Sequence, residues 1–211
     1  MKTNRSFLDY PEGERFAYFA LLAAIASADG RLDEQERRRL QELCREAHMS
    51  PEYTAHTLSI AEGTSEYDFR LAIETLRESE LRFLAVADML YIARADGKIT
   101  PDETSEIEGF CQSLNLNAAQ IQTLHRYVEK IIAAKTRGAD EDELQSLGEE
   151  FKNELTLAQV PGHVFGFSAG MMAGMSAVGT AVGVAAGIVS LPFALTYKGI
   201  QNLWKKFKGG K

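Results

Sequence analysis

The sequence lacks the residues and motifs that mark most enzymes and disulfide-stabilised proteins. Its two cysteines, Cys44 and Cys111, are too few and too far apart for a disulfide framework or a zinc knuckle. The four histidines share no metal-ligand spacing, and the chain contains no nucleophile elbow, phosphate-binding loop, dinucleotide fingerprint or zinc-protease motif. The first ten residues lack the apolar core of a signal peptide. We therefore expect a non-enzymatic protein whose body starts in the cytoplasm.

Positive charge is scarce in most of the chain. The net charge is −7, from 23 basic and 30 acidic residues, and all 30 acidic residues lie within residues 1–154. No charged residue occurs between Leu155 and Tyr197. The charged residues after this run are all lysines: Lys198, Lys205, Lys206, Lys208 and Lys211. An acidic body argues against nucleic-acid binding, because phosphate contacts require clustered lysine and arginine. The basic tail follows an apolar stretch, which favours contact with anionic lipid.

An internal repeat is the clearest pattern in the first two thirds of the sequence. With a shift of 67 residues, residues 24–32 (AIASADGRL) align with residues 91–99 (YIARADGKI), and Cys44 aligns with Cys111. Apolar residues recur at helical spacing within each copy, and no run alternates with a period of two. The pattern predicts an all-α domain built from a duplicated helix-turn-helix unit, in which both cysteines are buried small apolar residues.

The turn of each copy has recognisable helix stop and start signals. An Asp-Gly pair ends the first helix, because glycine readily adopts the left-handed conformation found at helix ends. Asp33 and Thr100 are the predicted N-caps of the next helix, and Glu36 and Glu103 complete capping boxes three residues later. Elsewhere, residues 67–95 predict one or two helices, residues 118–136 another, and residues 143–157 a short acidic helix after a polar break.

The paired corners resemble the "A-x-A-D-G-x-[LI]-x-x-x-E" signatures of the TerB-like family, which includes tellurite-resistance TerB and the helical domain of DjlA-type co-chaperones. The similarity covers roughly residues 10–135. It implies a compact TerB-like helical bundle in which the two Asp-Gly corners form an acidic patch. It also implies a role in bacterial stress, phage or colicin resistance, often in membrane-linked complexes, and metal binding at the patch.

The acidic corners have two interpretations. Residues from Asp29 to Glu36 fit the second half of a calcium-binding EF-hand loop, but Ile25 and Ser27 occupy the first two ligand positions, so neither corner alone supplies enough oxygen ligands. A shared Ca2+ or Mg2+ site remains open if the fold brings the corners together; its ligands would be Asp29, Asp33, Glu36, Asp96 and Glu103. In the second interpretation these residues only end and cap helices.

Residues 161–197 form a Gly/Ala-rich segment without charge. Its glycines form two rows with a spacing of four, Gly166, Gly170 and Gly174, and then Gly179, Gly183 and Gly187. On a helix this spacing places the glycines of a row on one face, where another helix can approach closely. So many glycines would destabilise a helix in water. In lipid the helix is favoured, because backbone groups outside a helix would find no water as a hydrogen-bond partner. The spacing favours a membrane-associated, self-associating helix or helical hairpin. A single span, a hairpin and a soluble helix packed in a larger assembly remain open.

The tail, residues 198–211, has the pattern of an interfacial amphipathic helix. Ile200, Leu203, Trp204 and Phe207 form an apolar stripe beside Lys205 and Lys206. Tryptophan is enriched at the level of the lipid headgroups, so we expect Trp204 to lie there.

The sequence thus divides into a TerB-like domain (1–137), an acidic linker helix (138–160), the membrane-associated segment (161–197) and the tail (198–211). We expect a homo-oligomeric scaffold or sensor on the cytoplasmic side of the bacterial inner membrane. The alternative is a membrane-permeabilising defence effector whose Gly/Ala segment inserts and whose TerB-like domain regulates it.

Overall fold

The structure is a computed structural model, and it describes residues 6–26, 34–95, 101–164, 201–202 and 204–205. Within these residues the fold is all-α, as the sequence predicts, with no strand. Its helices are α1 (Glu12–Ala26), α2 (Glu34–Glu46), α3 (Pro51–Ala61), α4 (Phe69–Arg77), α5 (Leu81–Ala95), α6 (Pro101–Ser113), α7 (Ala118–Thr136) and α8 (Glu141–Leu157). Short 3-10 turns lie at Phe7–Asp9 and Gly162–Val164.

Side-chain caps set several of the helix starts. The side chain of Asn117 accepts a hydrogen bond from the backbone N–H of Gln120 at 3.0 Å, and Oε1 of Gln120 accepts one from the backbone N–H of Asn117 at 3.0 Å. Helix α7 therefore begins in a capping box. Asp140 caps α8 in the same way through the N–H of Glu143, at 2.9 Å. Helix α7 has the predicted bounds, α8 starts two residues before the predicted range, and the 67–95 range contains two helices.

The duplicated unit is visible in the backbone at the ends of α2 and α6. His48 and Asn115, which are 67 residues apart, both have a left-handed conformation, with φ of 49° and 61°. In each copy the backbone N–H of the following residue donates a hydrogen bond to the carbonyl oxygen of a cysteine: Met49 to Cys44 at 2.9 Å, and Leu116 to Cys111 at 3.0 Å. This hydrogen bond pattern is a Schellman motif. Helices α1, α2 and α3 therefore correspond to α5, α6 and α7.

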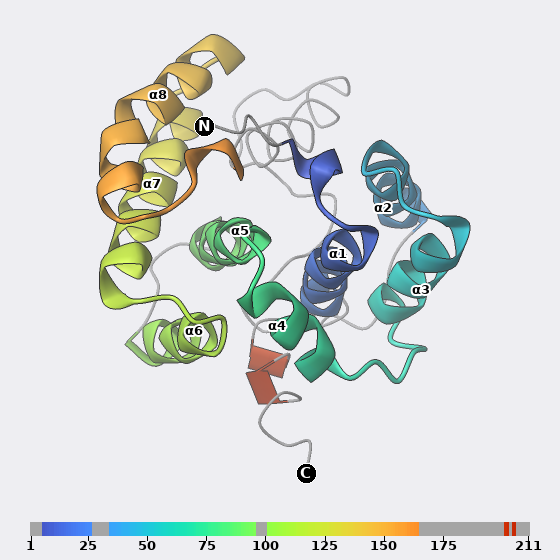
Figure 1. Ribbon diagram of the computed structural model, residues 1–211. Helices are drawn as coiled ribbons and strands as arrows, with labels where there is room; N and C mark the ends of the chain where they lie inside the picture. Colours follow the sequence, from blue (N-terminus) through green and yellow to red (C-terminus); the bar gives the residue numbers. More distant parts are fainter. Residues whose placement is uncertain (1–5, 27–33, 96–100, 165–200, 203, 206–211) are drawn as a thin grey trace.

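The two copies pack through their first helices. Figure 1 shows α1 and α5 near the middle of the bundle, with α2 and α3 beside α1, and α6, α7 and α8 beyond α5. Tyr18, Phe19 and Leu84 at this centre are at most 1% exposed. Full burial of a large apolar side chain contributes about 1.5–3 kcal/mol to folding, so these buried residues are a major source of stability.

Helix α8, in the segment expected to be an acidic linker, packs against α7. The ring of Phe151 lies 5.7 Å from that of Tyr127 in an edge-on arrangement, and Leu155 is 2% exposed. Beyond α8, Val160 and Val164 are also buried. Packed residues therefore continue along the chain to Val164.

The expected membrane segment lies almost wholly outside the described residues, which stop at Val164 and resume at Gln201. Among the helices that the structure describes, none is long and apolar enough to cross a membrane.

Candidate binding and membrane-contact surfaces

The predicted metal site falls at the two corners of the repeat. Helix α2 begins at Glu34 and α6 at Pro101, directly after the predicted N-caps Asp33 and Thr100. Asp29, Asp33 and Asp96 lie outside the described residues, and so do the side chains of Glu36 and Glu103, whose backbones lie in the first turns of α2 and α6. In the part of the chain that the structure does describe, no group of three or more His, Cys, Asp or Glu side chains could hold a metal ion.

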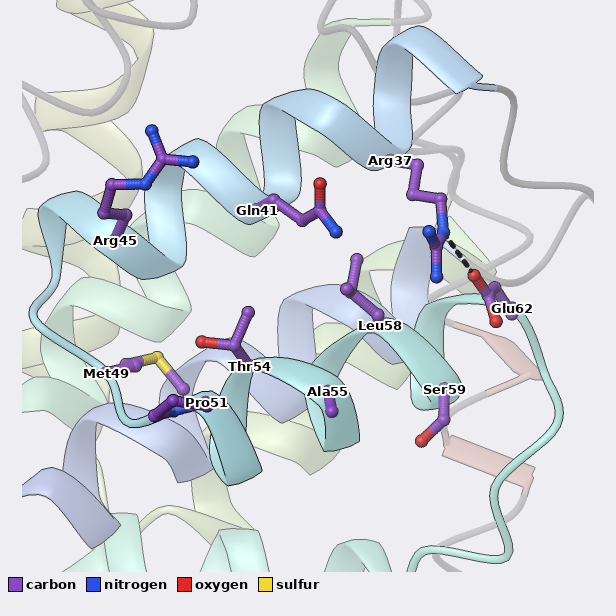
Figure 2. A pocket seen from close by; sticks show the side chains of 10 residues that line it. All are labelled: Arg37, Gln41, Arg45, Met49, Pro51, Thr54, Ala55, Leu58, Ser59 and Glu62. Carbon is purple, nitrogen blue, oxygen red and sulfur yellow. Dashed lines mark hydrogen bonds and ion pairs between the residues drawn. The ribbon is translucent and has the colours of Figure 1, made fainter.

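A groove of about 570 Å³ runs between α2 and α3 (Figure 2). Met49 and Leu58 supply apolar surface, and Gln41 and Thr54 add polar groups. At one end, Nε of Arg37 lies 2.7 Å from Oε1 of Glu62; this bond and the carboxylate charge raise the pKa of Arg37. The lining of the groove therefore combines apolar and polar groups.

The groove was not predicted, although a sequence signal for it exists. Arg37, Gln41 and Arg45 recur every fourth residue and therefore share one face of α2. Arg45 is exposed at the end of the groove opposite Arg37 (Figure 2). The residues at the matched positions of the second copy are Thr104 and Gln112, so the two arginines are particular to the first copy.

The tail contacts the bundle through Trp204. The indole is 8% exposed, and its ring lies 6.0 Å from that of Phe110 on α6. It covers Gly109, where an added β-carbon would lie 2.7 Å from Cζ2 of Trp204. Lys205, the next residue, is exposed to solvent. The structure thus places Trp204 against the bundle, where protein buries its apolar area, and its contact with lipid headgroups stays a prediction.

The remaining residues predicted to contact the membrane or to form the oligomer are not among those that the structure describes. Lys206 and the spaced glycines from Gly166 to Gly187 lie outside the described residues.

A buried polar cluster joins α1, α5 and α7. The hydroxyl of Tyr18 donates a hydrogen bond to the carboxylate of Asp88, and both residues are at most 4% exposed. Desolvation, followed by the negative charge of Asp88, raises the pKa of Tyr18 well above its ordinary value. On α7, Nζ of Lys135 lies 5.2 Å from the ring centre of Tyr91, and burial lowers the pKa of Lys135 to about 8. The aligned position to Asp88 in the first copy is Leu21.

The two cysteines are buried, as expected for small apolar residues. Cys44 and Cys111 are at most 1% exposed, and desolvation raises the pKa of each thiol to about 12. A reactive cysteine needs an accessible thiolate, so neither position suits nucleophilic or redox chemistry.

Comparison with known families tests the family resemblance that the two Asp-Gly turns suggest. A family model described as "Tellurite resistance protein TerB" matches residues 15–126, which is more than half of the chain. The chain belongs to the TerB family. Searches of curated proteins and of solved structures found no match.

The TerB match spans α1 to the first half of α7 and so includes both copies of the repeat. It also includes the α2–α3 groove and Gly109, but not α8 or Trp204. The TerB-family domain is thus the part of the chain on which the tail residue packs.

Proposed function

We propose that this TerB-family chain is a non-enzymatic scaffold or sensor that acts at the cytoplasmic face of a bacterial membrane during stress or defence. Family membership associates it with tellurite resistance. The observation that carries the membrane role is the separation of charge along the chain. Every acidic residue lies before Leu155, and every charged residue after Tyr197 is a lysine. Juxtamembrane lysines are attracted to anionic lipid headgroups, whereas an acidic body is repelled by them.

The Gly/Ala segment supplies the second part of the proposal. Small residues spaced by four allow helices to approach closely in lipid, which favours self-association through this segment. The membrane partner is therefore lipid, and the protein partner is a further copy of the chain.

The sequence of the tail also supports lipid contact, because Ile200, Leu203, Trp204 and Phe207 form an apolar stripe beside Lys205 and Lys206. An amphipathic segment of this kind places its apolar face in the interface and its lysines among the headgroups.

Co-sedimentation with vesicles tests the membrane role. We expect the full chain to pellet with vesicles that contain phosphatidylglycerol, and a chain ending at Val164 to stay in solution. The truncation keeps the buried residues Val160 and Val164, so it removes only the segment and the tail. Equal partitioning of the two chains would contradict the proposal.

Metal binding at the acidic corners is a separate element of the proposal. Carboxylates of Asp29, Asp33, Glu36, Asp96 and Glu103 are hard oxygen ligands of the type that Ca2+ and Mg2+ prefer. We expect millimolar Ca2+ or Mg2+ to raise the thermal midpoint of the chain by preferential binding to the folded state. The midpoint of an Asp29→Asn/Asp96→Asn variant should not move; an equal shift in both proteins would refute the site.

A further inference from the structure

Gly109 occupies an unusual position for a glycine, in the interior of α6 (Pro101–Ser113). Glycine disfavours helix because its backbone loses more freedom on folding than that of other residues. The matched residue of the first copy is Glu42, so the repeat itself does not require a glycine there. The structure gives a reason: an added β-carbon would lie 2.7 Å from Cζ2 and 3.1 Å from Cη2 of Trp204. The missing side chain leaves the space that the indole fills.

Trp204 and its neighbour Lys205 differ in exposure. Trp204 is 8% exposed and lies beside Phe110, which is fully buried, whereas Lys205 is exposed. The same indole is the group that an interfacial helix would place among lipid headgroups. One side chain cannot occupy both places, so the bundle and the membrane exclude each other as partners of Trp204.

We propose that the surface of α6 around Gly109 is a docking site for the C-terminal segment of this chain, and that anionic lipid competes with it for Trp204. The competition rests on the proposed membrane function; the docking site does not. The positive charge of the tail favours both the docked state and the lipid-bound state. The bundle carries all 30 acidic residues and attracts the lysine tail, while anionic headgroups attract the same lysines. The lipid charge then sets which partner holds the tail.

The proposal predicts how undocking changes lipid contact. When a binding-competent state is only partly populated, apparent affinity falls by the populated fraction, so a variant that empties the docked state contacts lipid more readily. Gly109→Leu fills the space of the indole. Gly13→Leu is the matched control, because Gly13 also lies in a helix and an added β-carbon there meets no atom within 4 Å.

Fluorescence of the full chain tests both parts, because Trp204 is its only tryptophan. In buffer, we expect the emission of Gly109→Leu to be red-shifted relative to the wild type and to Gly13→Leu. In vesicles containing brominated phosphatidylcholine and increasing shares of phosphatidylglycerol, quenching by the lipid reports Trp204 in the membrane. We expect the ratio of lipid-bound to docked tail to be on the order of tenfold higher for Gly109→Leu, equal to about 1.4 kcal/mol of docking free energy.

The possible results distinguish the docking site, the competition with lipid and the membrane function. Identical emission of wild type and Gly109→Leu in buffer would overturn the docking site. Red-shifted emission with equal quenching in all three proteins would overturn the competition while leaving membrane contact in place. Absence of quenching and of vesicle co-sedimentation in every variant would overturn the membrane function and the competition together, but not the docking site.

Circular dichroism checks that each variant is folded. If Gly109→Leu does not fold, Gly109→Ala replaces it, because alanine favours helix and its β-carbon alone forces the indole to move. An unshifted emission of Gly109→Ala would then overturn the docking site.

Discussion

The hydroxyl of Tyr18 on α1 donates a hydrogen bond to the carboxylate of Asp88 on α5, which joins the two copies of the repeat across 70 residues of sequence. Both side chains are buried. A hydrogen bond to a buried charge is worth more than one at the surface, because neither partner can turn to water.

Tyr18→Phe removes this bond and keeps the ring. We expect the free energy of unfolding to fall by about 1.5–3 kcal/mol, the usual cost for a hydrogen bond to a charged group. Urea denaturation measures it. Tyr53→Phe is a suitable control, because Tyr53 is also an aromatic residue of the bundle but stacks on Phe16 through its ring. Equal losses in the two variants would contradict the role assigned to the Tyr18 hydroxyl.

Lys135 predicts a pH dependence of stability. Burial lowers its pKa to about 8 in the folded chain, against an ordinary value of 10.5. The unfolded chain therefore holds the Lys135 proton more tightly, and stability rises with pH between these two values. Below pH 8 the charged lysine opposes folding in full, and the penalty is relieved as pH rises toward 10.5.

Lys135→Met has no such group, so we expect its stability advantage over the wild type to shrink by up to about 2 kcal/mol between pH 7 and pH 9.5. Urea denaturation at the two pH values gives this difference directly, and tyrosine titration cancels because both proteins share it. A constant difference would show that Lys135 keeps an ordinary pKa in the folded chain.

The left-handed residues at the matched helix ends predict a stabilising pair of substitutions. His48→Gly relieves a conformation that side chains other than Asn and Asp rarely adopt, so the unfolding free energy should rise by up to about 1 kcal/mol. Asn115→Gly should gain less, because asparagine tolerates this conformation. Thermal denaturation of both variants checks the order. A loss of stability in both would contradict the assigned helix-end geometry.

The fit of Trp204 on Gly109 predicts a non-additive pair of mutations. In a Trp204→Ala background, Gly109→Ala should stabilise the chain by roughly 0.5–1 kcal/mol, because alanine is the better helix former. With Trp204 present, the β-carbon displaces the indole and the gain is lost. A double-mutant cycle from denaturation curves measures the coupling. Additive effects would show that the two residues do not touch in solution.

Features set by local sequence were the ones that could be predicted. Helix α7 begins and ends where the sequence predicts, because its cap, Asn117, is adjacent to it in the chain. The register of the repeat could also be predicted, since the two copies align at a shift of 67 residues, and the left-handed residues His48 and Asn115 have the same separation. The resemblance of the corner residues to the TerB-like family was confirmed by the family match over residues 15–126.

Contacts between distant residues could not be predicted. In the sequence Asp88 is a polar residue in a mostly apolar helix. Its partner Tyr18 lies 70 residues away and meets it only in the folded chain. An indole such as that of Trp204 is equally suited to lipid and to a protein surface, and the sequence gives no sign that Gly109, 95 residues earlier, leaves room for it. The groove depends on the packing of α2 against α3, and the spacing of Arg37, Gln41 and Arg45 indicates only the α2 side of it.

Fractionation of bacterial cells that express the chain is the most direct test of its action at a membrane. Membranes from cells with the full chain and from cells with a chain ending at Val164 are washed with carbonate at high pH. The proposed function predicts that the full chain stays in the washed membrane and that the truncated chain is found in the soluble fraction. A full chain that is soluble, or that is removed completely by the wash, would contradict stable insertion of the Gly/Ala segment.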